Sequence, residues 1–89
     1  MTGNRTVTLR YFAWVREKVG RGEEQVSLPD SVATVADLTT WLKSRGPEYA
    51  AAFERDTVIR TAIDQNHAKP GAAIAGAREI AFFPPVTGG

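Results

Sequence analysis

Residues 5–12 read Arg-Thr-Val-Thr-Leu-Arg-Tyr-Phe, and apolar and polar side chains alternate along them. A period of two is typical of a strand with one buried face. We therefore predict a strand over 5–12 whose buried face carries Val7, Leu9 and Tyr11. Phe12 then falls on the opposite face, at the end of this strand.

The next residues predict a short helix and a second strand. Residues 13–19 contain no turn residue and stop at Gly20, as a helix with a glycine C-cap does. Residues 23–28 alternate again and are closed by Pro29. The pattern indicates a hairpin-like return with a helix inserted between its strands.

The clearest helix is predicted over residues 35–45. Thr34 is a suitable N-cap, and Asp37 places a carboxylate near the positive end of the helix. Gly46-Pro47 should end the helix. Its apolar positions have helical spacing and should cover the sheet; they are Val35, Leu38, Trp41 and Leu42.

The second half of the chain predicts a weaker helix over 47–54 and a third strand over 57–64. Residues 64–76 form a long connection that has room for a short strand or a helical turn around 72–77. The last strand is predicted over 78–83.

This order of elements does not alternate cleanly between strand and helix, so we predict an α+β fold with a mixed sheet covered by helices on one face. If the first and last strands pair, Ile80 and Phe82 join the buried face. Phe12 and Phe83 then lie on the opposite face, near the end of the chain. Exposed phenylalanines of this kind usually mark a partner surface. The alternative is that a loop covers them.

Composition limits the possible functions. The 89 residues are 43% hydrophobic and 24% charged, which predicts one globular domain over 1–89 with one modest core and no deep catalytic cleft. The net charge of +1 supplies no field for nucleic acid, and no stretch approaches the roughly 20 apolar residues of a membrane span. We expect a cytoplasmic protein that binds neither nucleic acid nor membrane. It contains no cysteine and so has no side-chain thiol.

The chain ends in Phe82-Phe83-Pro84-Pro85-Val86-Thr87-Gly88-Gly89. The prolines cannot extend a sheet, so residues 84–89 are predicted to project as a flexible tail. Two glycines without Cβ atoms give a thin end that can enter a narrow channel. The carboxylate of Gly89 is therefore the candidate reacting group, and Gly88 supplies reach. The alternative is an idle, frayed terminus.

Together with Tyr11-Phe12-Ala13-Trp14-Val15-Arg16-Glu17 and Ile63-Asp64-Gln65-Asn66, this ending resembles the small subunit of molybdopterin synthase, the MoaD family. The resemblance covers the chain from about Val7 onward, and its specific part is residues 82–89. It implies the ubiquitin-like β-grasp fold, in which the first and last strands are parallel neighbours in the middle of the sheet.

The resemblance also implies a chemistry. An ATP-using adenylyltransferase, similar to ubiquitin-activating enzymes, would adenylate the Gly89 carboxylate, and sulfur would replace AMP to give a thiocarboxylate. The tail would then enter the active site of the large catalytic subunit, in a heterotetramer, and donate sulfur to a cyclic pyranopterin phosphate. ATP would bind to the activating enzyme, and this chain would hold no cofactor or metal.

Carried over by position, the resemblance predicts contacts with the large subunit from Phe12, His67, Phe83, Pro84, Pro85, Val86 and Thr87. His67 departs from the family, which often has an aliphatic residue there. It is the only histidine and has no second ligand spaced around it, so we expect an exposed loop or an interface rim. Asp64-Gln65-Asn66 should shape a turn. Arg16 and Glu17 match the family's Arg-Glu pair, and they either contact a partner or are solvated.

Other functions stay open. The same carboxyl chemistry could serve thiamin, cysteine or tRNA sulfuration. Gly89 could instead be joined to target lysines, as in a ubiquitin-like modifier, or the chain could be an interaction module whose tail is idle. Fold alone does not separate these functions.

Overall fold

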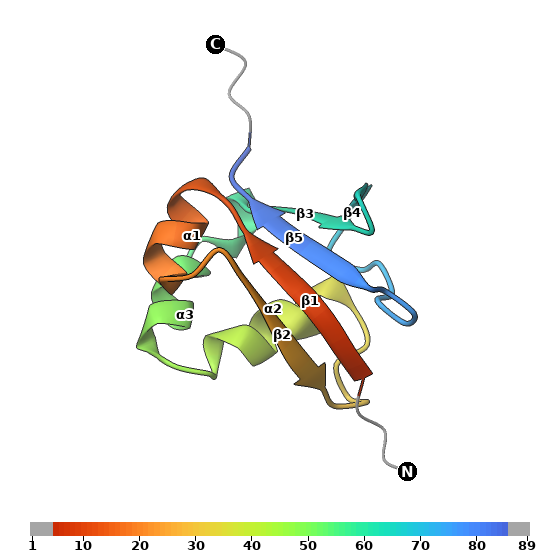
Figure 1. Ribbon diagram of the computed structural model, residues 1–89. Helices are drawn as coiled ribbons and strands as arrows, with labels where there is room; N and C mark the ends of the chain where they lie inside the picture. Colours follow the sequence, from red (N-terminus) through yellow and green to blue (C-terminus); the bar gives the residue numbers. More distant parts are fainter. Residues whose placement is uncertain (1–4, 86–89) are drawn as a thin grey trace.

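The computed structural model describes residues 5–85 (Figure 1). The elements follow one another in the order β1 (Arg5–Tyr11), α1 (Ala13–Val19), β2 (Glu23–Leu28), α2 (Val35–Lys43), α3 (Pro47–Ala52), the 3-10 helix η1 (Asp56–Val58), β3 (Arg60–Ile63), β4 (Asn66–Ala68) and β5 (Glu79–Phe83). Of the predicted tail, residues 86–89 lie outside the described residues.

The strands form one five-stranded sheet in the order β2-β1-β5-β3-β4. β1 and β5 run parallel, with Leu9 beside Ile80 and Tyr11 beside Phe82, and the other neighbouring strands are antiparallel. The predicted mixed sheet, with its first and last strands paired, is confirmed. Because β1 and β5 are parallel, both end at the same edge of the sheet.

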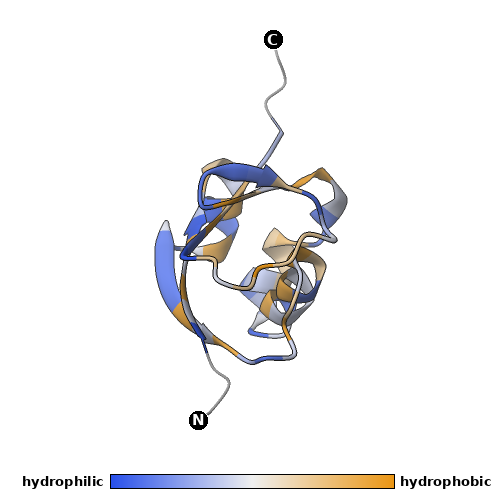
Figure 2. Ribbon diagram, turned by 90° about the vertical axis from the view of Figure 1, so that its right-hand side faces the viewer, coloured by the Kyte–Doolittle hydropathy of each residue, from blue (hydrophilic) through white to orange (hydrophobic). Residues whose placement is uncertain are grey.

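The helices lie on one side of this sheet, as the side view in Figure 2 shows. Between the two layers is a core built from the inward positions of the strands and the apolar faces of the helices. Its most deeply buried members are Leu9, Tyr11, Val15, Leu38, Leu42, Phe53, Ile80 and Phe82. The opposite side of the sheet, here called the outer face, carries Thr8, Arg10, Arg60, Ala81 and Phe83, by their alternation with the buried positions.

The predicted helix caps are present. Gly20 ends α1 with a φ of 91°, a left-handed conformation that glycine adopts without a steric penalty. Thr34 begins α2 through a capping box, in which its hydroxyl accepts from the Asp37 N–H at 3.1 Å and the Asp37 carboxylate accepts from the Thr34 N–H at 3.2 Å. Hydrogen bonds from the Ala33 and Thr34 N–H groups lower the pKa of Asp37. These reciprocal bonds fix where α2 starts.

Both later helices are shorter than predicted. α2 ends at Lys43 instead of residue 45, because Ser44 is its C-cap and donates its hydroxyl to the Trp41 carbonyl at 2.6 Å. α3 ends at Ala52 instead of residue 54, where Phe53 turns into the core and is fully buried. In both cases a side-chain contact, and not the sequence period, sets the end.

The third strand and the connection after it also differ from the prediction. β3 begins at Arg60, because Asp56–Val58 forms a 3-10 turn that leaves Val58 39% exposed. The short strand of the connection is β4, which precedes the predicted 72–77 region. There Ala73 makes only an isolated bridge to Thr34. The first and last strands are each one residue shorter than predicted, since β1 ends at Tyr11 and β5 begins at Glu79.

The turn between β3 and β4 is built on Asp64 and Gln65, as predicted. Their φ angles are 49° and 74°, which side-chain-bearing residues adopt only at a cost. The Asp64 carboxylate offsets part of this cost, because it accepts from the N–H groups of Arg78 and Glu79, each at 3.0 Å. Asp64 therefore ties the hairpin to the start of β5, whereas Gln65 has no comparable side-chain bond there.

Replacing Gln65 by glycine is expected to stabilise the fold by about 0.5–1 kcal/mol, since glycine accepts a positive φ and the strain exceeds its added chain entropy. Urea unfolding measures the change. The matched control is Gln25→Gly in β2, where the same substitution should destabilise by about 0.5–1 kcal/mol. Equal effects at the two positions would contradict the account of this turn.

Candidate functional site

The root of the tail lies where β1 and β5 end together. The Phe12 N–H donates to the Phe82 carbonyl at 3.1 Å, which brings Phe12 beside the last residues of β5. Phe83 closes β5, and Pro84 and Pro85 follow it outside any strand, both partly buried. Figure 1 shows the chain leaving the sheet at this edge. The placement agrees with the prediction that the prolines end the sheet.

Phe12 stands at the turn from β1 into α1. It is 39% exposed, although its neighbour Tyr11 is buried in the core. The next residue, Ala13, has a φ of 54°, so the backbone turns sharply after Phe12. The Arg10 guanidinium lies 5.3 Å from the centre of the Phe12 ring, within the range of a cation–π contact. The turn thus leaves an aromatic ring accessible beside the tail root.

Phe83 and His67 form the other part of the site. Their ring centres are 5.6 Å apart and their planes meet at 82°, an edge-to-face contact. His67 lies in β4 opposite Ala62, so the expectation of a loop was wrong, although the side chain is exposed as expected. Phe83 itself is partly exposed, and so no loop within residues 5–85 buries Phe12 or Phe83.

The structure therefore gathers part of the predicted interface at one edge of the sheet. Phe12, Phe83, Pro84 and Pro85 surround the tail root, and His67 adjoins Phe83. Val86, Thr87, Gly88 and Gly89 lie outside the described residues. A contact of any of these residues with a partner stays a prediction.

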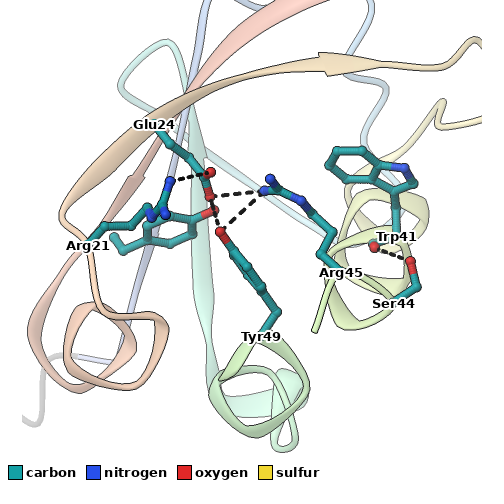
Figure 3. Close-up of polar contacts among 7 residues, drawn as sticks. Arg21, Glu24, Trp41, Ser44, Arg45 and Tyr49 are labelled. Atoms are coloured by element: carbon teal, nitrogen blue, oxygen red, sulfur yellow. Dashed lines mark hydrogen bonds and ion pairs between the residues drawn. The ribbon is translucent and has the colours of Figure 1, made fainter. Parts of the chain in front are cut away.

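A buried carboxylate that sequence reasoning missed lies near the start of β2, on the helix side of the sheet. The Glu24 side chain is only 6% exposed, and it accepts from the hydroxyls of Tyr49 at 2.7 Å and Tyr11 at 2.8 Å (Figure 3). Arg45 donates to it at 3.1 Å and Arg21 at 3.2 Å. The cluster joins β1 and β2 to α3 and to the loop before it.

Charge and burial act against each other at Glu24. Burial by itself raises the pKa of this carboxyl, but hydrogen bonds from Tyr49 and Tyr11 and the charge of Arg45 outweigh it, and the pKa of Glu24 falls below its ordinary value. Burial, followed by the hydrogen bond to Glu24, raises the pKa of both Tyr11 and Tyr49. Glu24 is thus held as a carboxylate and both tyrosines as neutral hydroxyls. Such a cluster stabilises the fold and offers no group for proton transfer.

The sequence did contain a signal for this cluster. In the alternation of β2, Glu24 shares its face with Val26 and Leu28, both of which are buried. A carboxylate at an inward position must find donors nearby, because an unpaired buried charge is very costly. Arg45, the last residue of the helix predicted over 35–45, is one of those donors.

The Arg-Glu pair of the sequence lies on the surface, and the two tryptophans lie at the edge of the core. Arg16 and Glu17 are exposed on α1, and the Arg16 side chain lies so close to Gly22 that a Cβ there would stand 3.2 Å from its Nε atom. A partner role for this pair stays a prediction. Trp14 and Trp41 are partly buried against the core, as expected.

A pocket of about 380 Å³ lies on the helix side of the sheet, between α2 and the β3–β4 hairpin. Its carboxylate, Asp56, is bound by Lys43 at 2.8 Å. Across residues 5–85, no group of three potential metal ligands comes together. None of the helices in this part of the chain has the length and apolar character needed to cross a membrane.

Comparison with known proteins matches residues 9–89 to the model of the ThiS family. The molybdopterin synthase sulfur carrier subunit of Haemophilus influenzae is 37% identical over 79 residues, which cover 89% of this chain and 94% of that protein. The subunit of the same name from Mycosarcoma maydis is 33% identical over 91 residues, 98% of this chain and 97% of that one. Among solved structures, SAMP1 from Haloferax volcanii superposes with a TM-score of 0.71 at 28% identity, covering 96% of this chain and all of that one.

Proposed function

The chain belongs to the ThiS family, and from this premise we propose that it is the sulfur carrier subunit of a molybdopterin synthase. The predicted ubiquitin-like β-grasp fold and the resemblance to the MoaD family are both confirmed. In the proposal, Gly89 carries the sulfur and the large synthase subunit receives the tail.

The observation that carries the proposal is the position of the tail root. β5 is the middle strand of the sheet, and it ends at Phe83 beside the exposed ring of Phe12. A tail that starts there is anchored through Phe82, which is fully buried in the core. A rigid root with accessible aromatic rings suits a carrier that docks on a partner and delivers its end into it.

The chemistry of such a carrier balances without any side-chain thiol. A carboxylate oxygen of Gly89 attacks the α-phosphorus of ATP on the activating enzyme, and pyrophosphate leaves. Hydrosulfide, HS⁻, then attacks the acyl carbon, and AMP leaves with the oxygen, which gives a thiocarboxylate and releases one proton. Adenylation is needed because a free carboxylate has no good leaving group. The sulfur so attached is a stronger nucleophile than the oxygen it replaces.

Mass spectrometry of the intact protein tests this chemistry directly. The protein is incubated with a ubiquitin-activating-like adenylyltransferase of its source organism, ATP and a sulfur donor. A carrier exchanges one oxygen for sulfur at Gly89, whereas a modifier becomes attached to a lysine and an idle tail stays unchanged. Omission of ATP is the control. Either of the last two outcomes would remove the carrier assignment.

Copurification and complementation test which sulfur pathway is served. We expect the chain to copurify with the large molybdopterin synthase subunit and to restore molybdoenzyme activity in a strain that lacks its own small subunit. Failure of both, together with successful loading of Gly89, would favour a carrier for thiamin, cysteine or tRNA sulfuration.

A ubiquitin-like modifier is the second candidate. It is favoured by the structural likeness to SAMP1, which belongs to proteins described as small archaeal modifier proteins. The curated relatives named as sulfur carrier subunits are more similar in sequence, at 33–37% against 28% identity. We therefore place the carrier function first.

Truncating Phe83 to alanine is expected to weaken binding to the large subunit by about 2–4 kcal/mol, the size found for buried aromatic anchors at interfaces. Titration calorimetry measures the affinity. Thr40→Ala is the control, because Thr40 is an exposed residue of α2, on the helix side of the sheet (Figure 2) and not on the outer face. If both variants bind as tightly as the wild type, Phe83 is not an interface anchor.

A further inference from the structure

Two arginines flank the tail root on the outer face. Arg60 stands beside Phe83 in the register of β3 and β5, and side chains paired in this way have Cβ atoms about 4.5–5.5 Å apart. Arg10 lies under the ring of Phe12 on β1. The aromatic rings at this edge are therefore accompanied by positive charge.

Within the part of the chain that the structure describes, these arginines are weakly paired. Arg60 is exposed and takes part in no ion pair among residues 5–85. Arg10 reaches Glu79 at 3.5 Å and Glu23 at 3.7 Å, longer than the roughly 2.7–2.9 Å of a strong charged hydrogen bond, and its side chain is 42% exposed. The Nε atom of Arg10 is itself buried, but the exposed part of the Arg10 side chain and the Arg60 guanidinium remain available to another molecule.

Cations elsewhere in the fold have closer partners. Lys43 binds Asp56 at 2.8 Å, and Arg45 and Arg21 bind the buried Glu24 at 3.1 and 3.2 Å. The contacts of Lys43 and Arg45 join segments that are 13 and 21 residues apart in the chain, so they have a structural purpose. Arg60, by contrast, forms no ion pair with another element within the described residues, so its charge is not used inside this part of the fold.

We propose that these arginines select the partner of the tail: the surface that receives Phe12 and Phe83 presents at least one carboxylate to Arg60 and an acceptor to Arg10. This inference rests on the proposed function and adds the electrostatic character of the partner surface. Guanidinium groups recognise carboxylates with a planar pair of hydrogen bonds, and opposite charges also speed encounter.

The same charges act against unwanted association. An accessible patch of Phe12, Phe83 and Pro84 without charge would also adhere to other copies of itself. Arginines on two copies of this chain repel each other, whereas an acidic partner surface is attracted. The same arginines thus favour binding of the partner and disfavour self-association. Carriers that share the tail sequence can thus be directed to different receiving subunits by the residues around the tail root.

The test is the affinity of the full chain for the large synthase subunit of its source organism, measured by calorimetry at about 50 mM and about 1 M sodium chloride. Arg60→Glu should bind about tenfold more weakly than the wild type at low salt, and the difference should shrink to less than about threefold at high salt, where charges are screened within about 3 Å. Arg60→Lys keeps the charge and should retain most of the affinity.

Lys18→Glu is the matched control, because it makes the same change of charge at an exposed site on α1, beside the pocket that Ala51 and Arg55 also line. Its affinity should stay within about twofold of the wild type at both salt concentrations. The inference is wrong if Arg60→Glu binds like the wild type, if its loss persists unchanged at high salt, or if Lys18→Glu loses as much. Wild-type protein that does not bind the large subunit at either salt concentration would instead overturn the proposed function.

Discussion

Deletion of Gly89 is expected to abolish sulfur loading and transfer while the free energy of unfolding changes by less than about 0.5 kcal/mol. The deletion moves the terminal carboxylate one residue toward the root, and one extended residue spans about 3.3–3.6 Å. A reacting atom displaced by that distance leaves productive geometry, because a shift of about 1 Å already costs roughly a hundredfold in rate. The buried core includes Phe82 and none of residues 83–85, so the fold should persist.

Two measurements check this prediction. Intact mass after incubation with the activating enzyme reports loading, and thermal unfolding followed by circular dichroism reports stability. Gly71→Ala is the control, since a Cβ at Gly71 meets no atom within 4 Å and the loop lies far along the chain from the tail. Loss of the fold on deletion of Gly89 would show that the tail is structural, and full loading of the shortened chain would refute the role of this residue.

Replacing Glu24 by glutamine is expected to destabilise the fold by about 2–4 kcal/mol. Removing one charge from a buried, hydrogen-bonded cluster leaves the opposite charges buried without a partner. This costs about 3–5 kcal/mol when the whole cluster is buried. Arg45 and Arg21 are 30% and 56% exposed, so water recovers part of that cost. Urea unfolding near neutral pH measures the effect.

The control is the neighbouring residue in the same strand. Glu23→Gln removes a carboxylate that is 61% exposed and lies 3.7 Å from Arg10, and such a surface pair contributes less than about 1 kcal/mol. If Glu23→Gln and Glu24→Gln destabilise equally, the cluster around Glu24 does not hold β2 to the helices as described.

The same carboxylate makes stability depend on pH. Because the pKa of Glu24 is lower in the folded state, its contribution is complete above the unfolded value of about 4.3 and is lost as the pH falls through the lower folded value. Wild-type protein should therefore lose stability on acidification more steeply than Glu24→Gln. Unfolding curves measured from pH 6 down to about pH 3 check this, and parallel declines for the two proteins would contradict it.

Much of the fold follows from local signals in the sequence. The alternation over residues 5–12 assigned Val7, Leu9 and Tyr11 to the core, and all three are buried. Thr34 and Gly20 marked ends of helices because their roles depend only on nearby backbone groups. The predicted bounds were wrong where contacts with residues distant in the sequence set the end of an element. At Phe53, burial against Phe82 ends α3 two residues before the predicted end.

The site could be predicted only in part, for a similar reason. The alternation of the first and last strands, together with their pairing, predicts that Phe12 and Phe83 lie near each other, and the structure confirms the pairing. His67 lies in a strand against Phe83 because of the register of β3 with β4 and with β5. Residues close to His67 in the sequence do not determine that register. The four donors of Glu24 likewise come from separate places in the chain: β1, the loop before β2, the loop before α3, and α3 itself.

Whether Gly89 carries sulfur in the cell can be read from the intact mass of the protein purified from sulfur-replete cells, with fragmentation to locate any change. The account predicts a fraction of molecules in which one oxygen of the Gly89 carboxyl is replaced by sulfur, and the loss of that fraction in cells without the activating enzyme. A terminus that carries only an ordinary carboxylate in cells with an active molybdopterin pathway, even when the large subunit is absent and cannot consume the sulfur, would contradict it.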